Sequence, residues 1–479
     1  MEALPSPLKL LRLIAVLLAI PLLAVLITAQ AAGASTCNRR GTVEELLACV
    51  AADAGPVIQQ LAVTAVLLGL GLVVGISLAG ALARVNRVLL VALFIPGLYL
   101  TNLALIVLVL LHGLLALASL TFVASLVRIP LLALGLLVIA GGTVCGILAM
   151  IRTSFRVVRR ARATVSGRLL EPGTHFALSS FVRQLAESLG TRPPTQIVAG
   201  LEPTFFVTEA DVQCLDGRLK GRTLYVSLAA CRILTQLELQ AIISHELAHF
   251  RGWDTGYSRL FYPFYRGTAN SLTAVAHRAR GGIGGVAFFP AWYILGYFLE
   301  SFAAAERDIG RQRELTADRV AAGMAGEVAV ATALVKLYGF SRAWWQVQVR
   351  LREAVARSRS RRAGRHHGSE RNDPQALNLS TLFVEASAQL ARSVWLLKDL
   401  DDEEPLHPTD SHPPLSTRLQ ALQLSISDVA RAALRIPPER AAISLFADPG
   451  ALERDLTARE VNALAHSPFS PRGKKGAGG

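Results

Sequence analysis

Residues 241–254 have the sequence Ala-Ile-Ile-Ser-His-Glu-Leu-Ala-His-Phe-Arg-Gly-Trp-Asp and contain the pattern H-E-x-x-H. In a helix, side chains at positions i and i+4 lie on one face, so His245 and His249 can reach a single metal ion. Glu246 lies beside them, close enough to deprotonate a metal-activated water. The apolar residues on both sides indicate a packed helix, not a chance match on a surface helix. The stretch therefore predicts a zinc metalloprotease site.

A catalytic zinc site usually has three protein ligands and one open position, so a third ligand is expected elsewhere in the chain. The acidic candidates downstream are Glu300, Glu306 and Glu314. We favour Glu314, because Asp318 follows it by one helical turn and can orient a ligand from the same face. The residues alone leave open the alternative that Glu314 is an ordinary glutamate on a charged helix face.

The composition is that of a membrane protein, with 52% hydrophobic and 18% charged residues. The net charge of +14 comes mostly from arginines, which cluster next to apolar segments with few aromatic residues among them. This placement indicates membrane orientation and contact with anionic lipid headgroups, and it argues against a nucleic-acid partner. The five cysteines include no C-x-x-C pair, which argues against a cysteine zinc site.

Four apolar segments in the N-terminal part are each long enough to cross a bilayer. They cover residues 10–31, 58–82, 89–118 and 121–151. Arginines in the 83–88 loop and at 152–168 place the N-terminus and everything after residue 151 in the cytoplasm by the positive-inside rule. We therefore predict an integral protein of a bacterial inner membrane, with its soluble part on the cytoplasmic side.

Two features of the N-terminal part leave alternatives open. The first apolar segment is expected to be a retained span, but Ala29-Gln30-Ala31 also fits the cleavage site of a signal peptide. Cys37 and Cys49 then lie outside the cytoplasm, where they are either a disulfide or two unpaired thiols.

The expected fold is mainly α with a small antiparallel β-sheet, an α+β zincin-like protease domain, plus an N-terminal transmembrane helix bundle. The expected domains are a membrane domain at 1–151, a basic linker at 152–169, the protease domain at 170–435 and a C-terminal extension at 436–479 with a disordered tail. Strand-like segments at 196–228 precede the metal-binding helix, and an exposed strand edge there can hold an extended peptide by main-chain pairing.

Two further segments inside the expected protease domain have distinct compositions. Residues 282–304 are apolar, and we predict that they form a buried or membrane-apposed helical segment. A single additional span there would move Glu314 to the other side of the membrane from His245. Residues 355–375 are rich in arginine and predict a mobile basic loop.

Three blocks of sequence, in order, resemble the membrane gluzincins of peptidase family M48, which contains HtpX-type quality-control proteases and CAAX prenyl endopeptidases. The blocks are His-Glu-Leu-Ala-His at 245–249 with Asp254 beyond it, Arg-Gln-Arg-Glu-Leu-Thr-Ala-Asp at 311–318, and His-Pro-Pro-Leu-Ser-Thr-Arg at 412–418. The resemblance covers about 195–425 and does not extend to the first 150 residues. Gly310 departs from the family pattern, which often has serine before the arginine.

The resemblance implies one Zn²⁺ per chain, with Glu246 as general base and proton shuttle. The implied ligands are His245, His249 and Glu314. It also implies that the carboxylate of Asp318 supports the third ligand and that His412 hydrogen-bonds the oxyanion of the tetrahedral intermediate. Arg418 is expected to partner an acidic residue, and Asp254 to lie around the site.

We therefore expect a membrane-anchored zinc endopeptidase that acts on membrane-associated proteins or peptides in membrane protein quality control. One alternative is a processing protease with a narrow, lipidated or signalling substrate. The other is a catalytically silent membrane scaffold that keeps the protease fold. The physiological substrate and the oligomeric state do not follow from the sequence.

Overall fold

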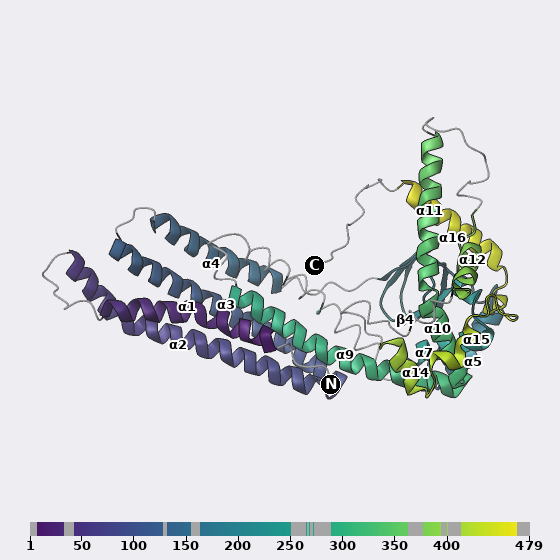
Figure 1. Ribbon diagram of the computed structural model, residues 1–479, viewed down its shortest axis with the longest axis horizontal. Helices are drawn as coiled ribbons and strands as arrows, with labels where there is room; N and C mark the ends of the chain where they lie inside the picture. The colour runs from purple at the N-terminus through teal and green to yellow at the C-terminus, as the bar shows by residue number, and fades with distance from the viewer. Residues whose placement is uncertain are drawn as a thin grey trace. The chain divides into compact units, whose positions relative to one another are not determined.

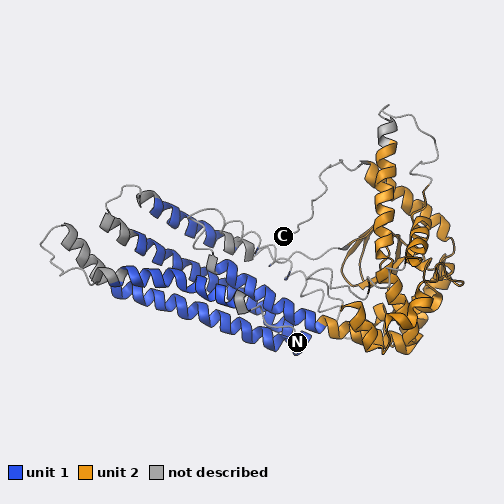
Figure 2. Ribbon diagram, viewed as in Figure 1, with its two compact units in different colours: residues 1–160, 257–309 blue, residues 161–256, 310–479 orange. Residues whose placement is uncertain are grey.

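A computed structural model describes residues 7–32, 43–127, 132–154, 163–250, 265, 268, 272, 289–362, 377–393, 400 and 413–466. The chain divides into two compact units, shown in Figure 2. Unit 1 contains residues 1–160 and 257–309, and unit 2 contains residues 161–256 and 310–479. The expected linker at 152–169 is divided between them, because β1 and β2 belong to unit 2.

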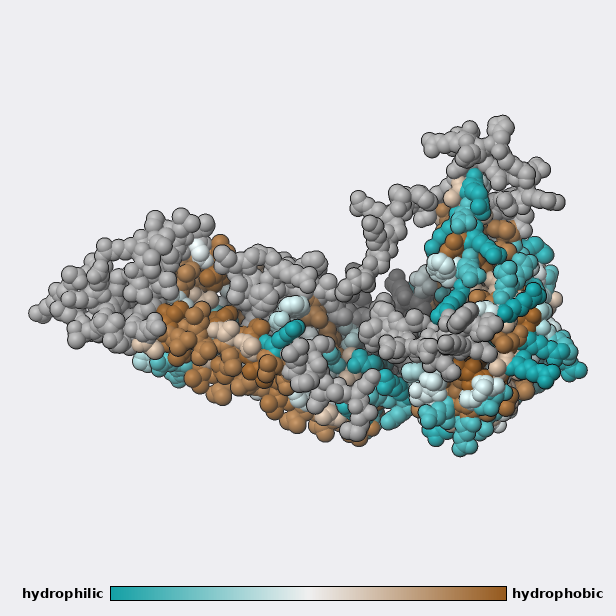
Figure 3. Space-filling model, in the orientation of Figure 1, coloured by the Kyte–Doolittle hydropathy of each residue, from teal (hydrophilic) through white to brown (hydrophobic). Residues whose placement is uncertain are grey.

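Unit 1 is a bundle of long apolar helices (Figure 1). They are α1 (Pro7–Ala32), α2 (Val43–Ala83), α3 (Arg87–Val127) and α4 (Leu132–Ser154). Within the described residues, α1, α2 and α3 are long and apolar enough to cross a membrane, while the apolar part of α4, Gly135–Leu148, is shorter. Large hydrophobic side chains such as Leu11, Leu67 and Leu103 are exposed on these helices (Figure 3). Such a surface suits lipid, so the protein is integral to a membrane.

Helix α9 (Phe289–Ala325) begins in unit 1, and the boundary between the two units falls within it, after Ile309. Residues 289–304 therefore belong to unit 1, although the expected protease domain included them. The reason is aromatic packing: the ring of Phe94 lies 5.4 Å from that of Phe298 and 5.3 Å from that of Phe302, measured between centroids. All three side chains are buried. Residues 282–288 lie outside the described part of the chain.

The described residues of unit 2 form two small sheets. The larger one has the strand order β2-β3-β7-β4, with β4 at one edge. Its strands are β2 (Gly167–Leu169), β3 (Gln196–Gly200), β7 (Thr223–Ser227) and β4 (Phe206–Thr208). The sheet is mixed and not antiparallel as expected, because its central strands β3 and β7 run parallel while the two outer pairs are antiparallel. The smaller sheet contains β1 (Ala163–Thr164), β5 (Val212–Cys214) and β6 (Gly217–Leu219).

Outside the sheets, the described part of unit 2 is mostly helical, so the fold is mainly α with small sheets, as expected. The helices include α5 (Phe176–Ser188), α6 (Leu228–Cys231), α7 (Gln236–Ala248), α10 (Glu327–Gly339), α11 (Ser341–Arg362), α12 (Leu379–Ala391), α14 (Leu415–Ala421), α15 (Ile426–Ala433) and α16 (Pro449–His466), with a 3₁₀ turn at Ala442–Leu445. A capping box starts α7: Thr235 accepts from the backbone N–H of Glu238, and the Glu238 carboxylate accepts from that of Thr235.

Two segments near the C-terminus differ from what the sequence predicted. Residues 355–362 form the end of α11, because Leu351 and Val355 are buried in the main core. Helix α16 is part of unit 2 and not an extension beyond it. The buried carboxylate of Glu453 accepts bonds of 2.5 and 2.6 Å from the guanidinium of Arg232 on unit 2. Residues 363–376 and 467–479 lie outside the described residues.

Candidate metal centre

The two histidines of the H-E-x-x-H pattern lie at the end of α7. His245 is in the last turn and His249 is the C-cap residue, with helical φ and ψ of −67° and −18°. His249 therefore still lies one helical turn after His245, and the centroids of the two rings are 4.9 Å apart. Buried apolar side chains on the opposite face, including Leu239, Ile243 and Leu247, hold the helix in the core.

Glu314, from the part of α9 that belongs to unit 2, faces both rings. Its Oε2 atom lies 3.3 Å from Nε2 of His245, and its Oε1 atom lies 3.4 Å from Nε2 of His249. Ligand atoms of the three residues all lie within 4.8 Å of one another. Tetrahedral ligands at about 2.1 Å from a zinc ion are roughly 3.4 Å apart, so these residues fit the ion that the motif implies.

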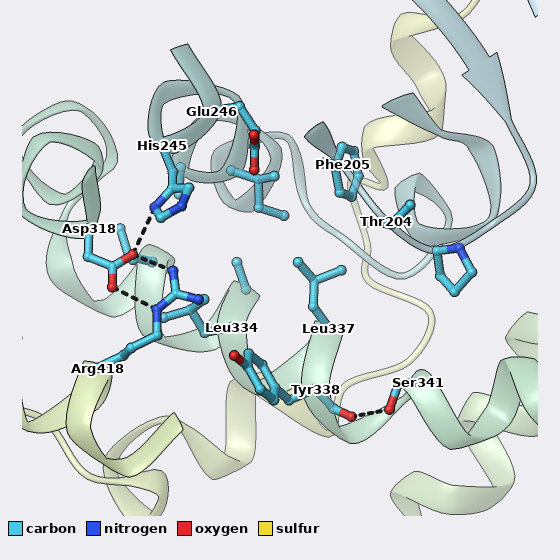
Figure 4. Close-up of a pocket in the computed structure, with 15 residues that line it drawn as sticks. Thr204, Phe205, His245, Glu246, Asp318, Leu334, Leu337, Tyr338, Ser341 and Arg418 are labelled. Carbon is cyan, nitrogen blue, oxygen red and sulfur yellow. Dashed lines mark hydrogen bonds and ion pairs between the residues drawn. The ribbon is translucent and has the colours of Figure 1, made fainter. Parts of the chain in front are cut away.

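Asp318 and Arg418 support the same group of side chains, as Figure 4 shows. Oδ1 of Asp318 lies 2.9 Å from Nδ1 of His245, on the opposite side of the ring from Glu314. Arg418 donates to both oxygens of Asp318, at 2.8 Å through Nε and 2.6 Å through Nη2. Asp318 and Arg418 are both buried, so this two-pronged contact fixes the carboxylate that orients the ring.

The electrostatics of the cluster favour a positive charge at His245. Burial alone lowers the pKa of this imidazole, but the contacts with Asp318 and Glu314 outweigh burial and raise its pKa to about 9. Burial raises the pKa of Asp318, yet Arg418 and His245 outweigh it, so this pKa lies below its usual value. A site that stabilises a cation in this way suits a metal ion as well as a proton.

A pocket of about 330 Å³ opens beside the cluster. Glu246 and His245 form part of its wall, together with residues of α10 and the segment 203–205 that leads into β4 (Figure 4). The edge strand of the larger sheet therefore begins at the pocket. A carboxylate, a candidate metal site and an apolar cavity thus lie together, which is the arrangement that metal-assisted hydrolysis needs.

The structure brings together most of the residues that the sequence singled out. The group consists of His245, Glu246, His249, Glu314, Asp318 and Arg418. Asp254 and His412 lie outside the described residues. The wall formed by Leu334, Leu337 and Tyr338 was missed, because α10 carries no motif and its apolar run indicates only a buried helix.

Comparisons with known proteins agree with the geometry. Residues 213–425 match the sequence model of peptidase family M48. The matched range contains the H-E-x-x-H pattern, the glutamate that faces both histidines and the arginine that holds Asp318. Neither the curated proteins nor the solved structures give a match to the chain. Residues 213–425 therefore form a metallopeptidase domain of family M48, in a chain whose N-terminal helices are long and apolar enough to cross a membrane.

Proposed function

We propose that this protein is a zinc endopeptidase of the HtpX type that cleaves membrane-associated protein substrates during membrane protein quality control. The observation that carries the proposal is the position of Glu314. Its two oxygens lie 3.3 and 3.4 Å from the Nε2 atoms of His245 and His249, beside a pocket that contains Glu246. This donor set, two imidazoles and one carboxylate, is the one that catalytic zinc prefers in peptidases.

His245, His249 and Glu314 would hold the zinc ion. When bound, zinc supplies a Lewis acid that polarises the substrate carbonyl and lowers the pKa of the attacking water to about 7. Glu246 accepts a proton from that water and delivers it to the leaving amine. Asp318 holds the His245 ring through Nδ1, which leaves Nε2 directed toward the ligand position. His412, assigned from the resemblance of its sequence block, donates a hydrogen bond to the oxyanion.

The substrate is proposed to bind in an extended conformation along β4. Among the described strands, β4 pairs with β7 alone and forms the edge of the larger sheet. An extended peptide can add to such an edge by main-chain hydrogen bonds, which hold it without demanding a particular sequence. Residues Pro203, Thr204 and Phe205 lead from the pocket into this strand, so a peptide paired there passes the candidate metal centre.

The proposed location is the cytoplasmic face of a bacterial inner membrane. It is supported by the arginines at 83–88 and 152–168, which flank the apolar helices of unit 1. Cysteine labelling tests the topology. A cysteine placed at the exposed Glu187 of α5 should react only with a membrane-permeant reagent in intact cells.

The activity is tested with the purified full chain. We expect about one zinc per chain and cleavage of an unfolded membrane protein or a casein-like substrate. Glu246→Gln should lower the cleavage rate by about 10²–10⁴-fold while keeping the zinc, because it removes the proton acceptor and not a ligand. Glu187→Gln, the same change on an exposed helix face, is the control. Unchanged cleavage by Glu246→Gln would exclude this mechanism, and no metal-dependent cleavage at all would favour the silent scaffold.

A further inference from the structure

One wall of the pocket carries side chains that the proposed hydrolysis does not use. Val330, Ala333, Leu334 and Leu337 follow one another at intervals of three, one and three residues along α10, which places them on one side of this helix. Ile242 of α7 also lines the cavity. The ring of Phe205 does so as well (Figure 4). These residues thus form an apolar surface beside the proposed catalytic groups, and Tyr338 and Ser341 add polar groups at the end of this wall.

The charges of the pocket are confined to its other side. Among the described lining residues, the side chains that can carry a charge near neutral pH are those of His245, Glu246, Asp318 and Arg418, all of them at the candidate metal centre. Asp318 and Arg418 are paired with each other at 2.6 and 2.8 Å. A charged substrate side chain placed against Val330, Ala333 and Leu334 would lose its water without gaining a charged partner, so this part of the pocket disfavours it.

The volume of the pocket limits what can enter. At about 330 Å³ it lies at the lower end of ligand cavities and holds one large side chain, not a folded element. The pocket is open at two small lining residues, Ala241 on α7 and Ala333 on α10, each 1% exposed. A larger residue at either position would project into the space that a substrate side chain needs.

We propose that this pocket selects substrates by a bulky apolar side chain, of leucine to phenylalanine size, next to the scissile bond, and that Ala333 sets the size limit. The inference rests on the proposed peptidase function and names its substrate class. Folded soluble proteins bury such side chains, whereas unfolded chains and segments extracted from a membrane expose them. The pocket therefore directs cleavage to apolar segments of unfolded polypeptides.

Quenched fluorescent peptides test the selection with the zinc-loaded full-length protein in detergent. Two peptide series carry Leu, Phe, Ala or Asp, one series at the residue before the scissile bond and the other at the residue after it. At one of these two positions, Leu and Phe should give kcat/KM values about 10- to 100-fold above Ala, and Asp should fall below Ala. A flat profile at both positions would overturn the proposal.

Two alanine variants test the role of Ala333. Ala333→Val should lower kcat/KM for the Leu and Phe peptides about 10-fold more than for the Ala peptide, because its added methyl groups occupy the pocket. Ala331→Val is the matched control, since Ala331 is buried on the same helix but does not line the pocket. It should change all peptides by one common factor. An unchanged Leu-to-Ala ratio in Ala333→Val would contradict the assignment.

A second variant covers the case in which Ala333→Val does not fold. Leu337 lines the pocket and is only half-buried, so Leu337→Ala enlarges the cavity with less disturbance of the core. It should raise the Phe-to-Leu ratio of kcat/KM several-fold, and an unchanged ratio would count against the proposal.

The failure of this inference differs from a failure of the proposed function. Cleavage that depends on Glu246 but shows no preference in either series would refute the pocket alone. If no peptide were cleaved, or if Glu246→Gln cleaved them all normally, both the pocket and the proposed peptidase would be refuted.

Discussion

Helix α7 has a buried ionic contact near each end, and the two contacts differ in their charge balance. Near the N-terminus, Nζ of Lys336 donates to the Glu238 carboxylate at 2.8 Å and to the carbonyl oxygen of Ile233 at 2.9 Å. Near the C-terminus, Arg418 binds Asp318, and Asp318 lies 2.9 Å from His245. The first contact matches one cation with one carboxylate. The second adds Glu314, so two carboxylates face a single guanidinium.

The pKa values of the two buried bases show the consequence. Burial dominates at Lys336 and lowers the pKa of its ammonium, even though Glu238 acts in the opposite direction. At His245 the carboxylates of Asp318 and Glu314 dominate and raise the pKa of the imidazole to about 9. A matched pair therefore tolerates its cation, whereas the cluster with excess negative charge attracts one. This excess distinguishes the candidate metal centre from the structural pair that holds α10 against α7.

The largest effect on stability is expected at the matched pair. Lys336→Met leaves the Glu238 carboxylate buried without its cation and should lower the free energy of unfolding by about 3–5 kcal/mol. Proteolysis of the full chain in increasing denaturant measures it. The double variant Lys336→Met with Glu238→Gln should recover part of the loss, and the folded fraction of either variant should still bind zinc. A loss of zinc without a loss of stability would reverse the roles assigned to the two contacts.

Metal removal should destabilise the protein only through the candidate metal centre formed by His245, His249 and Glu314. Zinc at about 100 times its dissociation constant should stabilise the fold by about 2.7 kcal/mol relative to the metal-free protein. A zinc titration followed by thermal unfolding measures this increment. It should vanish in His245→Ala and persist in Glu187→Gln, a change on the exposed face of α5. An equal increment in His245→Ala would show that zinc binds elsewhere.

The carboxylate of Asp318, which contacts the proposed ligand His245, should raise the affinity for zinc. Asp318→Asn keeps the shape of the side chain but removes the charge that orients His245, and it should weaken zinc affinity by about 10- to 100-fold. Competition with a chelator of known affinity gives the change. Glu238→Gln, which alters the carboxylate of the matched pair, should leave zinc affinity within a few-fold of the wild type. Equal effects of the two variants would remove the distinction between the contacts.

The smallest effect concerns pH. Because the pKa of Lys336 is lower in the folded chain than in the unfolded chain, the unfolded state binds more protons between those two values. The stability contribution of this residue should therefore rise as the pH increases through that window toward about 10.5 and be constant below it. Unfolding of the wild type and of Lys336→Met, compared over the same alkaline range, isolates it. A difference that falls with rising pH would contradict the lowered pKa.

Local patterns account for much of what was predicted. Three of the four apolar runs of the N-terminal part lie in described helices long and apolar enough to cross a bilayer, and these two properties belong to each helix alone. Aromatic packing, which the runs do not encode, decided that residues 289–304 of α9 belong with these helices. The capping box of α7 likewise lies within four residues, but the lysine that binds its Glu238 comes from α10.

By itself, the sequence determined that His245 and His249 share a helix face and that Asp318 lies one turn from Glu314, because helical periodicity relates residues a few positions apart. Only the tertiary structure decided that Glu314 faces both histidines and that Arg418, 100 positions along the chain, binds Asp318. It also decided that α10 completes the pocket. These contacts depend on the packing of separate helices, and packing brings together residues whose spacing in the sequence carries no periodic signal.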